Sequence, residues 1–280
     1  MIVRIAFLFI AFLLGAPSAL PQTTTGPDKG TLIVHGGGRM QDDIAQKFIE
    51  LAGCDDGKIV VVPTAAGGDN FGERSLEIFK KYGARNVTLL HTRDRKTANS
   101  EEFIKPLKEA TAVWFGGGRQ WRLVDAYSGT KAEEAFREVL ERGGVVGGSS
   151  AGATIQGSFL ARGDTRNNQI MSGDHKNGFG YIKNVAIDQH VIARNRQFDM
   201  FDILKERPEL LGLGIDENTA IIVKKNEFEV VGENYVVVYD GTFWSREGTS
   251  LKTVPKAPFY FLRRGDRYDL ANRKVIPRRR

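Results

Sequence analysis

The sequence of 280 residues contains a single cysteine, Cys54, so no intramolecular disulfide can form. The fold must therefore be held by burial of apolar side chains, and a hydrophobic content of 41% is ordinary for that purpose. Cys54 stands among glycines and aspartates with no histidine beside it. We expect it to be packed and inert rather than reactive or bound to a metal.

Apolar runs of membrane-spanning length are also lacking. The run at 5–14 has ten residues, whereas a transmembrane helix needs roughly 20. This run follows the cation Arg4 and precedes small residues, which is the order of a secretory signal peptide. We expect residues 1–19 to be cleaved during export to the periplasm or the extracellular space, which leaves no stable membrane anchor. The segment 20–30, rich in Thr, Gly and Pro, is predicted to be a spacer.

No aromatic residues are interspersed with the last arginines of the basic C-terminus. The net charge of the chain is +6, and much of the excess lies near that end. A nucleic-acid groove combines such cations with aromatic side chains on which bases stack. We therefore expect a solvated tail and no nucleic-acid partner.

Residues 31–280 are expected to form one domain in which apolar runs alternate with amphipathic stretches. The runs show no polar alternation, as is typical of strands buried on both faces, and the helices between them supply the crossovers of a parallel sheet. This pattern predicts an α/β fold of the flavodoxin-like, doubly wound type, with a mainly parallel sheet and helices on both faces. After residue 157 shorter apolar pieces predict added, partly antiparallel edge strands. The first strands are predicted at 32–34, 59–62, 87–90, 112–115 and 145–146, and the helices at 42–51, 72–81, 100–109, 120–127, 131–142 and 194–206.

The loops that follow the predicted strands are where chemistry is expected, because ligands of such sheets lie beyond the carboxyl ends of the strands. Ser150 stands in Gly-Ser-Ser-Ala-Gly, which fits the nucleophile-elbow pattern G-x-S-x-G between a buried run and a helix. In such an elbow the backbone amide of Ala151 would help to bind an oxyanion. Ser150 is therefore the predicted nucleophile.

A serine nucleophile needs a base, and the chain offers four histidines. His190 is the best placed, since it ends the short apolar strand at 185–187. His35, which closes the first strand, is the rival candidate. We expect His91 and His175, which lie in polar surroundings, to be solvated.

A carboxylate should orient the base, and two neighbours are candidates. Asp216 and Glu217 both follow the apolar run at 211–215. Spacing alone leaves the choice between them open.

Four segments together resemble the cyanophycinase and dipeptidase E family of serine peptidases, which have a class I glutamine amidotransferase-like fold. They are Phe-Gly-Gly-Gly-Arg-Gln at 115–120, Gly-Ser-Ser-Ala-Gly-Ala at 148–153, Asp-Gln-His at 188–190 and Gly-Ile-Asp-Glu-Asn-Thr-Ala at 214–220. The resemblance covers roughly residues 31–240. The order Ser, His, Glu also disfavours an ordinary α/β-hydrolase esterase, in which the acid precedes the histidine.

The resemblance implies a role for each matching residue. Ser150 would be the nucleophile, His190 the base and Glu217 the third member, while Gly117 and Ala151 would supply the oxyanion amides. The matching substrate-pocket positions are Gln120, Asp188, Gln189, Arg194 and Arg196.

Two departures from the family pattern leave the substrate open. Cyanophycinases resemble one another in three arginines after the histidine, whereas this chain has Asp199 where the third would fall. The family's acidic pair after the first strand is replaced by residues 38–40, Gly-Arg-Met. A carboxylate in place of a guanidinium would repel an acidic substrate group.

The expected function is that of an exported serine exopeptidase that hydrolyses aspartyl or β-aspartyl peptides, such as cyanophycin or isoaspartyl dipeptides, through an acyl-enzyme. No metal or organic cofactor is implied. The alternatives are an esterase or amidase for small substrates, and a non-catalytic binding protein on the same fold, whose mark would be a broken triad. Assembly as a homodimer is left open.

Overall fold

The computed structural model describes residues 23–68, 71, 74–246 and 258–278. The expected signal peptide at 1–19 lies outside these residues. In the described part of the chain, no helix is both long and apolar enough to cross a membrane.

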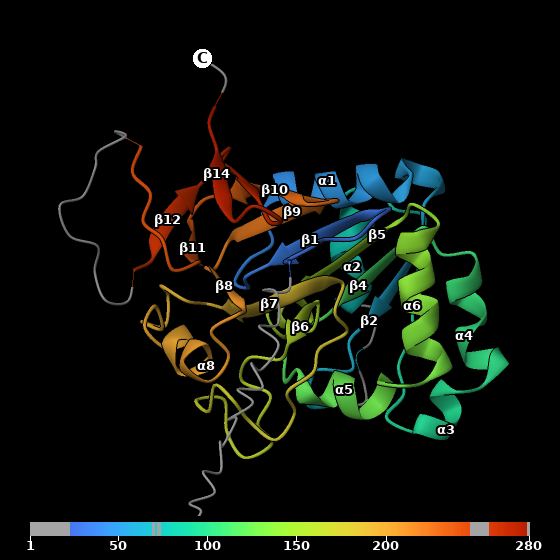
Figure 1. The fold of residues 1–280 in the computed structure, drawn as a ribbon. Coiled ribbons are helices and arrows are strands. Elements are labelled where there is room, and N and C mark those ends of the chain that lie inside the picture. The colour runs from blue at the N-terminus through green and yellow to red at the C-terminus, as the bar shows by residue number, and fades with distance from the viewer. Residues whose placement is uncertain (1–22, 69–70, 72–73, 247–257, 279–280) are drawn as a thin grey trace, which may run out of the picture.

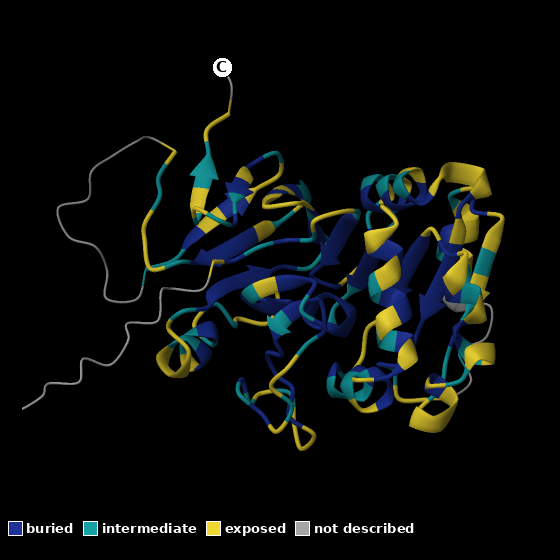
Figure 2. Cartoon of the chain, turned by 45° about the vertical axis from the view of Figure 1, so that its right-hand side comes forward, coloured by how far each residue is buried: buried dark blue, intermediate teal, exposed yellow. Residues whose placement is uncertain are grey.

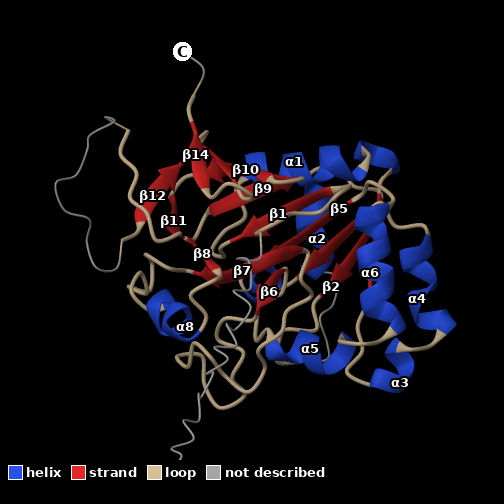
Figure 3. Cartoon of the chain, in the orientation of Figure 1, coloured by secondary structure: helices blue, strands red, loops and turns tan. Residues whose placement is uncertain are grey.

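A nine-stranded sheet forms the centre of the fold (Figures 1 and 3). Its five strands β1 to β5 pair in parallel, as the unbroken apolar runs predicted. Four later strands extend the sheet from β1 by antiparallel pairing, which confirms the predicted antiparallel edge. In spatial order the strands are β14 (Lys274–Ile276), β13 (Arg267–Asp269), β10 (Glu227–Gly232), β9 (Thr219–Lys224), β1 (Thr31–His35), β5 (Val145–Ser149), β4 (Ala112–Phe115), β2 (Lys58–Val62) and β3 (Asn86–Leu89).

The remaining strands form a separate five-stranded sheet, whereas the sequence predicted them at the edge of a single sheet. Three of them pair in parallel, and the other two join by antiparallel pairing, first to this group and then to each other. Apolar periodicity identifies a strand, but its partner depends on contacts between distant segments, so the second sheet could not be seen in the pattern. In spatial order the strands are β12 (Tyr260–Arg263), β11 (Tyr235–Tyr239), β8 (Leu211–Ile215), β7 (Ile182–Gln189) and β6 (Gly157–Phe159).

Helices cover both faces of the central sheet, and the predicted α/β fold is confirmed. One face packs against α1 (Asp42–Ala52) and α2 (Arg74–Lys81). The other face packs against the second sheet and against five helices. Helix α8 (Met200–Glu206) covers the far side of that second sheet. The strands between these layers are the buried centre of the molecule (Figure 2). The remaining helices are α3 (Arg95–Ala98), α4 (Glu101–Lys108), α5 (Trp121–Tyr127), α6 (Lys131–Glu141), α7 (Ala151–Thr154) and α8 (Met200–Glu206).

Two local predictions were wrong. The helix expected at 194–206 begins only at Met200, because the residues after His190 form hydrogen-bonded turns. Cys54, expected to be packed, is exposed at the start of a one-turn 3₁₀ helix, Cys54–Asp56, and has a positive φ of 55°.

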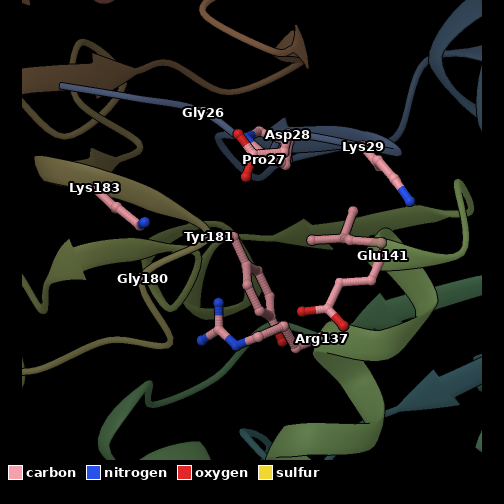
Figure 4. Close-up of a pocket in the computed structure, with 10 residues that line it drawn as sticks. Gly26, Pro27, Asp28, Lys29, Arg137, Glu141, Gly180, Tyr181 and Lys183 are labelled. Carbon is pink, nitrogen blue, oxygen red and sulfur yellow. The ribbon is translucent and has the colours of Figure 1, made fainter.

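The described part of the expected spacer lies against the domain. Thr24 is fully buried, and Thr25 forms a β-bridge with Lys183 near the start of β7. Beside this segment a cleft of about 490 Å³ opens between α6 and Tyr181 (Figure 4). The cleft lies where β1 and β7 begin, at the opposite ends of these strands from His35 and Gln189, so it is separate from the site described next.

Candidate active site

Ser150 lies in a strained turn between β5 and α7. Its φ and ψ are 56° and −110°, a region that residues other than glycine seldom occupy. The flanking glycines permit the turn. A Cβ on Gly148 would lie 2.3 Å from the carbonyl oxygen of Gly152, and one on Gly152 would lie 2.1 Å from that of Phe115. The sequence therefore folds this segment as the elbow that the G-x-S-x-G pattern predicted.

A continuous chain of hydrogen bonds starts at the elbow. The Ser150 Oγ lies 2.9 Å from Nε2 of His190, and Nδ1 of the same ring lies 2.6 Å from Oε1 of Glu217. The serine follows β5, the histidine follows β7 and the glutamate follows β8, so three strand ends converge here. This is the spatial order of a nucleophile, a base and an orienting carboxylate.

Asp216, the alternative carboxylate, has a different position. It is almost fully buried, and its Oδ1 accepts hydrogen bonds of 3.0 and 2.9 Å from the amides of Ile192 and Ala193. These bonds fix the turn that follows His190. The carboxylate next to the imidazole is therefore that of Glu217.

The environment of His190 favours its neutral form. Burial lowers the pKa of the imidazole below 6.5, the hydrogen bond to Glu217 opposes this shift, and the nearby charges of Arg194 and Arg196 lower the pKa further. A neutral imidazole at pH 7 is able to accept a proton from a serine hydroxyl.

Gly37 packs directly against the His190 ring, and sequence reasoning gave this glycine no role. Its φ is +112°, and a Cβ at this position would lie 2.2 Å from the imidazole Cε1. Only glycine allows the first loop to approach the ring so closely. The sequence does show a run of glycines at 36–38 after the first strand, but this run does not indicate that His190 packs against it.

We expect Gly37→Ala to lower kcat/KM at least about 100-fold, because a displacement of the base by about 1 Å can cost that much. Turnover should be measured beside thermal unfolding. Gly68→Ala is the matched control, since a Cβ there meets nothing within 4 Å. Wild-type turnover in a folded Gly37→Ala protein would contradict the placement of His190.

The structure directs the His35 imidazole to Ser149 rather than to the Ser150 hydroxyl. Its Nδ1 lies 3.0 Å from the Oγ of Ser149, and burial lowers its pKa to about 4. His91 and His175 were expected to be solvated, and both are bonded instead. His91 lies 2.8 Å from the Oγ1 of Thr64, and His175 forms ion pairs with Asp125 and Asp174.

The predicted oxyanion residues both lie beside the nucleophile. A Cβ on Gly117 would be 3.5 Å from the Cβ of Ser150, and Ala151 is the next residue along the chain, at the start of α7. Within the described ranges, no group of three or more His, Cys, Asp and Glu side chains is placed to hold a metal.

The predicted substrate-pocket residues divide into two groups. Gln189 is close to the nucleophile, with its Oε1 3.5 Å from the Ser150 Oγ. Arg194 is exposed and Arg196 is partly buried, and both act electrostatically on His190. Gln120 and Asp188 are buried and bonded within the protein. Their assignment to the substrate pocket stays a prediction.

Asp199 was expected to face the pocket, to pair with Arg194 or Arg196, or to face solvent on its helix. Its ion-pair partner in the described residues is Arg162, at 2.6 Å. Arg162 is buried and also pairs with Asp188, at 2.7 Å. Sequence reasoning missed it because one arginine in the polar stretch 161–176 carries no distinguishing signal.

Comparison with known proteins identifies the family. The model of peptidase family S51 matches residues 32–231. The chain belongs to peptidase family S51. It is thus a serine-type peptidase, as the elbow and the resemblance predicted.

Two relatives and two solved structures show the extent of this S51 similarity. The chain is 33% identical to the cyanophycinase of Geminocystis herdmanii, and the alignment covers 86% of this chain and 90% of the relative. It is 29% identical to the cyanophycinase of Trichormus variabilis, and that alignment covers 92% of each protein. A peptidase from an acI-B1 Actinobacterium superimposes with a TM-score of 0.64 at 25% identity, covering 86% of this chain and 97% of that one. A putative peptidase E from Listeria monocytogenes shares the fold, with a TM-score of 0.54 at 17% identity, covering 73% and 99%.

Proposed function

We propose that Ser150, His190 and Glu217 are the catalytic triad of this peptidase, and that it hydrolyses aspartyl or β-aspartyl peptides as an exopeptidase. The observation that carries the proposal is the unbroken hydrogen-bonded chain from the serine hydroxyl through the imidazole to the carboxylate. The strained elbow adds support, because such strain is common where a nucleophile must be exposed.

The geometry supports acyl transfer in two stages. His190 Nε2 takes the proton of Ser150 as its Oγ attacks the scissile carbonyl, and the amides of Gly117 and Ala151 hold the resulting oxyanion. The imidazolium, stabilised and oriented by Glu217, gives the proton to the leaving amine as the C–N bond breaks. Water then attacks the acyl-enzyme with His190 again as base, and the acid product leaves as Ser150 regains its proton.

The charge beside the triad supports an acidic substrate. Within the described residues, neither Arg194 nor Arg196 forms an ion pair with a carboxylate, and the charges of both act on His190. An unpaired guanidinium is a ready partner for a carboxylate of the substrate. Cyanophycinases among the relatives favour the same class, and we extend to this chain a cyanophycin-like or isoaspartyl substrate.

We also propose that the protein acts outside the cytoplasm. The support is the sequence order of residues 1–19, with one cation, a short apolar run and small residues. Mass spectrometry of the N-terminus of the exported protein tests this, and the expected new terminus lies near residue 20. An intact N-terminus with all of the protein in the cytoplasm would contradict it.

A substrate panel tests the activity. Purified protein should be incubated with cyanophycin, β-aspartyl dipeptides, α-linked dipeptides and simple esters. We expect the fastest turnover with the aspartyl substrates. Preference for the esters would favour a small-substrate esterase, and binding without turnover of any of them would favour a non-catalytic protein.

A further inference from the structure

Arg162 lies beneath the site and belongs to none of the motifs. Its side chain is 1% exposed, and its φ is 56°, so backbone and side chain are both held in an uncommon arrangement. Every nitrogen of its guanidinium has a partner. Nε and Nη2 bond the two oxygens of Asp188 at 2.7 and 2.8 Å, Nη2 also bonds Asp199 at 2.6 Å, and Nη1 bonds the carbonyl of Asn168 at 2.9 Å.

This one cation faces two carboxylates that are not equivalent. The Asp188 side chain is 2% exposed, whereas the Asp199 side chain is 39% exposed. Asp188 is fixed further by the amide of Gln189, which donates to its Oδ1 at 2.9 Å. Asp199 has only Arg162 as an ion-pair partner within the described ranges.

Asp199 also lies close to Arg196, which is predicted to bind substrate, because the backbone amide of Asp199 donates a hydrogen bond of 3.0 Å to the carbonyl of Arg196. The charges of Arg162, Asp188, Arg194 and Asp199 all act on the pKa of Arg196. Arg196 makes a long bond of 3.4 Å to the carbonyl of Gln189 and no ion pair to any described carboxylate. An Asp199 that was not held by Arg162 would therefore find an unpaired guanidinium close by.

We propose that Arg162 is a positioning residue for substrate selection: it holds Asp199 away from Arg196 and so keeps that guanidinium free for a carboxylate of the substrate. This inference rests on the proposed function of the site. The proposal also explains why Asp199 can lie close to a pocket that is proposed to bind an acidic substrate. The carboxylate of Asp199 is bound to Arg162 and is therefore not bound to Arg196.

The fork geometry of the guanidinium is what the role requires. Arginine presents several N–H groups in a plane, so it can bind both oxygens of Asp188 and still reach Asp199. A lysine has a single ammonium, which is a point charge without that fork. Arg162→Lys therefore keeps the buried charge for Asp188 and releases Asp199.

The test compares two matched dipeptides, a β-aspartyl substrate with a free C-terminal carboxylate and its C-terminal amide. In Arg162→Lys we expect KM for the acid to rise about tenfold, the effect of losing a partly screened charge contact. KM for the amide and both kcat values should change less than about threefold, a margin that corresponds to a weak surface interaction. Asp199→Asn alone should leave the ratio of the two KM values near that of the wild type, because Arg162 already holds the Asp199 carboxylate away from Arg196.

The double variant Arg162→Lys/Asp199→Asn decides the mechanism. We expect it to restore the acid-to-amide ratio, because no carboxylate is left to occupy Arg196. If Arg162 had only a structural role, Arg162→Lys would lower the hydrolysis of the acid and of the amide alike. Adding Asp199→Asn would then not restore either activity. An unchanged ratio in folded Arg162→Lys, or a raised ratio that Asp199→Asn fails to restore, would overturn the proposal.

A second background covers the case in which Arg162→Lys does not fold. Replacing the buried pair as Arg162→Met/Asp188→Asn removes both of its charges, so neither is left buried alone. Adding Asp199→Asn to this background should lower the ratio of the acid KM to the amide KM about tenfold, toward the wild-type value, because it removes the carboxylate that would pair with Arg196. No change on adding Asp199→Asn contradicts the proposal. Failure of the wild type to hydrolyse either dipeptide would instead refute the proposed function itself.

Discussion

Ser150→Ala is expected to reduce kcat/KM about 10⁴-fold or more on an aspartyl dipeptide, because it removes the proposed nucleophile of a triad whose members act as a unit. The fold should persist. The side chain is only partly buried and small, so its removal leaves no large cavity, and the strained backbone is set by the glycines on either side. Turnover and thermal unfolding should be measured on the same preparation.

Ser149→Ala is the matched control for the nucleophile. The two serines are adjacent, but the Oγ of Ser149 bonds His35 rather than His190. We expect this variant to retain activity. Retained activity in a folded Ser150→Ala, with loss in Ser149→Ala, would transfer the nucleophile to the neighbouring serine.

The second large effect concerns the base. His190→Ala should reduce kcat/KM about as far as Ser150→Ala does, roughly 10⁴-fold, since neither residue functions without the other. His35→Ala should do much less, because the His35 imidazole bonds the Ser149 Oγ, whereas the Ser150 Oγ lies beside His190. The opposite ranking of the two histidine variants would assign the base to His35.

The pH dependence of the wild type gives an independent reading of the same base. Only neutral His190 accepts the serine proton, so kcat/KM should rise with pH as the imidazole loses its proton. Because burial lowers the pKa of His190 from 6.5, the midpoint of this rise should lie below pH 6.5. A midpoint well above that value would show that another group is titrating.

The parts of the site that could be predicted are those that local sequence encodes. Ser150 follows from its glycine-rich turn, and His190 from its position at the end of an apolar strand. The choice of Glu217 over Asp216 needed the family resemblance, because adjacent carboxylates after one strand are equivalent to any spacing argument. The structure separates them by their partners, which are an imidazole for one and two backbone amides for the other.

The parts that could not be predicted depend on contacts between distant segments. Arg162 meets Asp199 across 37 positions of sequence, and neither residue lies in a motif. The sequence showed an aspartate at position 199 in place of an arginine, but it did not show that Arg162 binds that aspartate. The second sheet was missed for the same reason, because its strands are recognisable locally and their pairing is not.

Asp199 shows how this limit affects function. Its charge alone predicted repulsion of an acidic substrate, and that reasoning assumed that no cation was close. Its ion pair with a buried arginine removes the assumption. In the function that we propose, acceptance of an acidic group depends on the three-residue cluster of Arg162, Asp188 and Asp199, and not on the residue at one position.

Covalent labelling tests the central claim, that Ser150 is an activated nucleophile, most directly. The purified protein should be treated with a serine-directed fluorophosphonate, and the adduct located by peptide mass mapping. We predict one adduct, on Ser150, that forms more slowly when an aspartyl dipeptide is present and is lost in His190→Ala. Absence of labelling in protein that turns over substrate, or an adduct on Ser149 instead, would contradict the account.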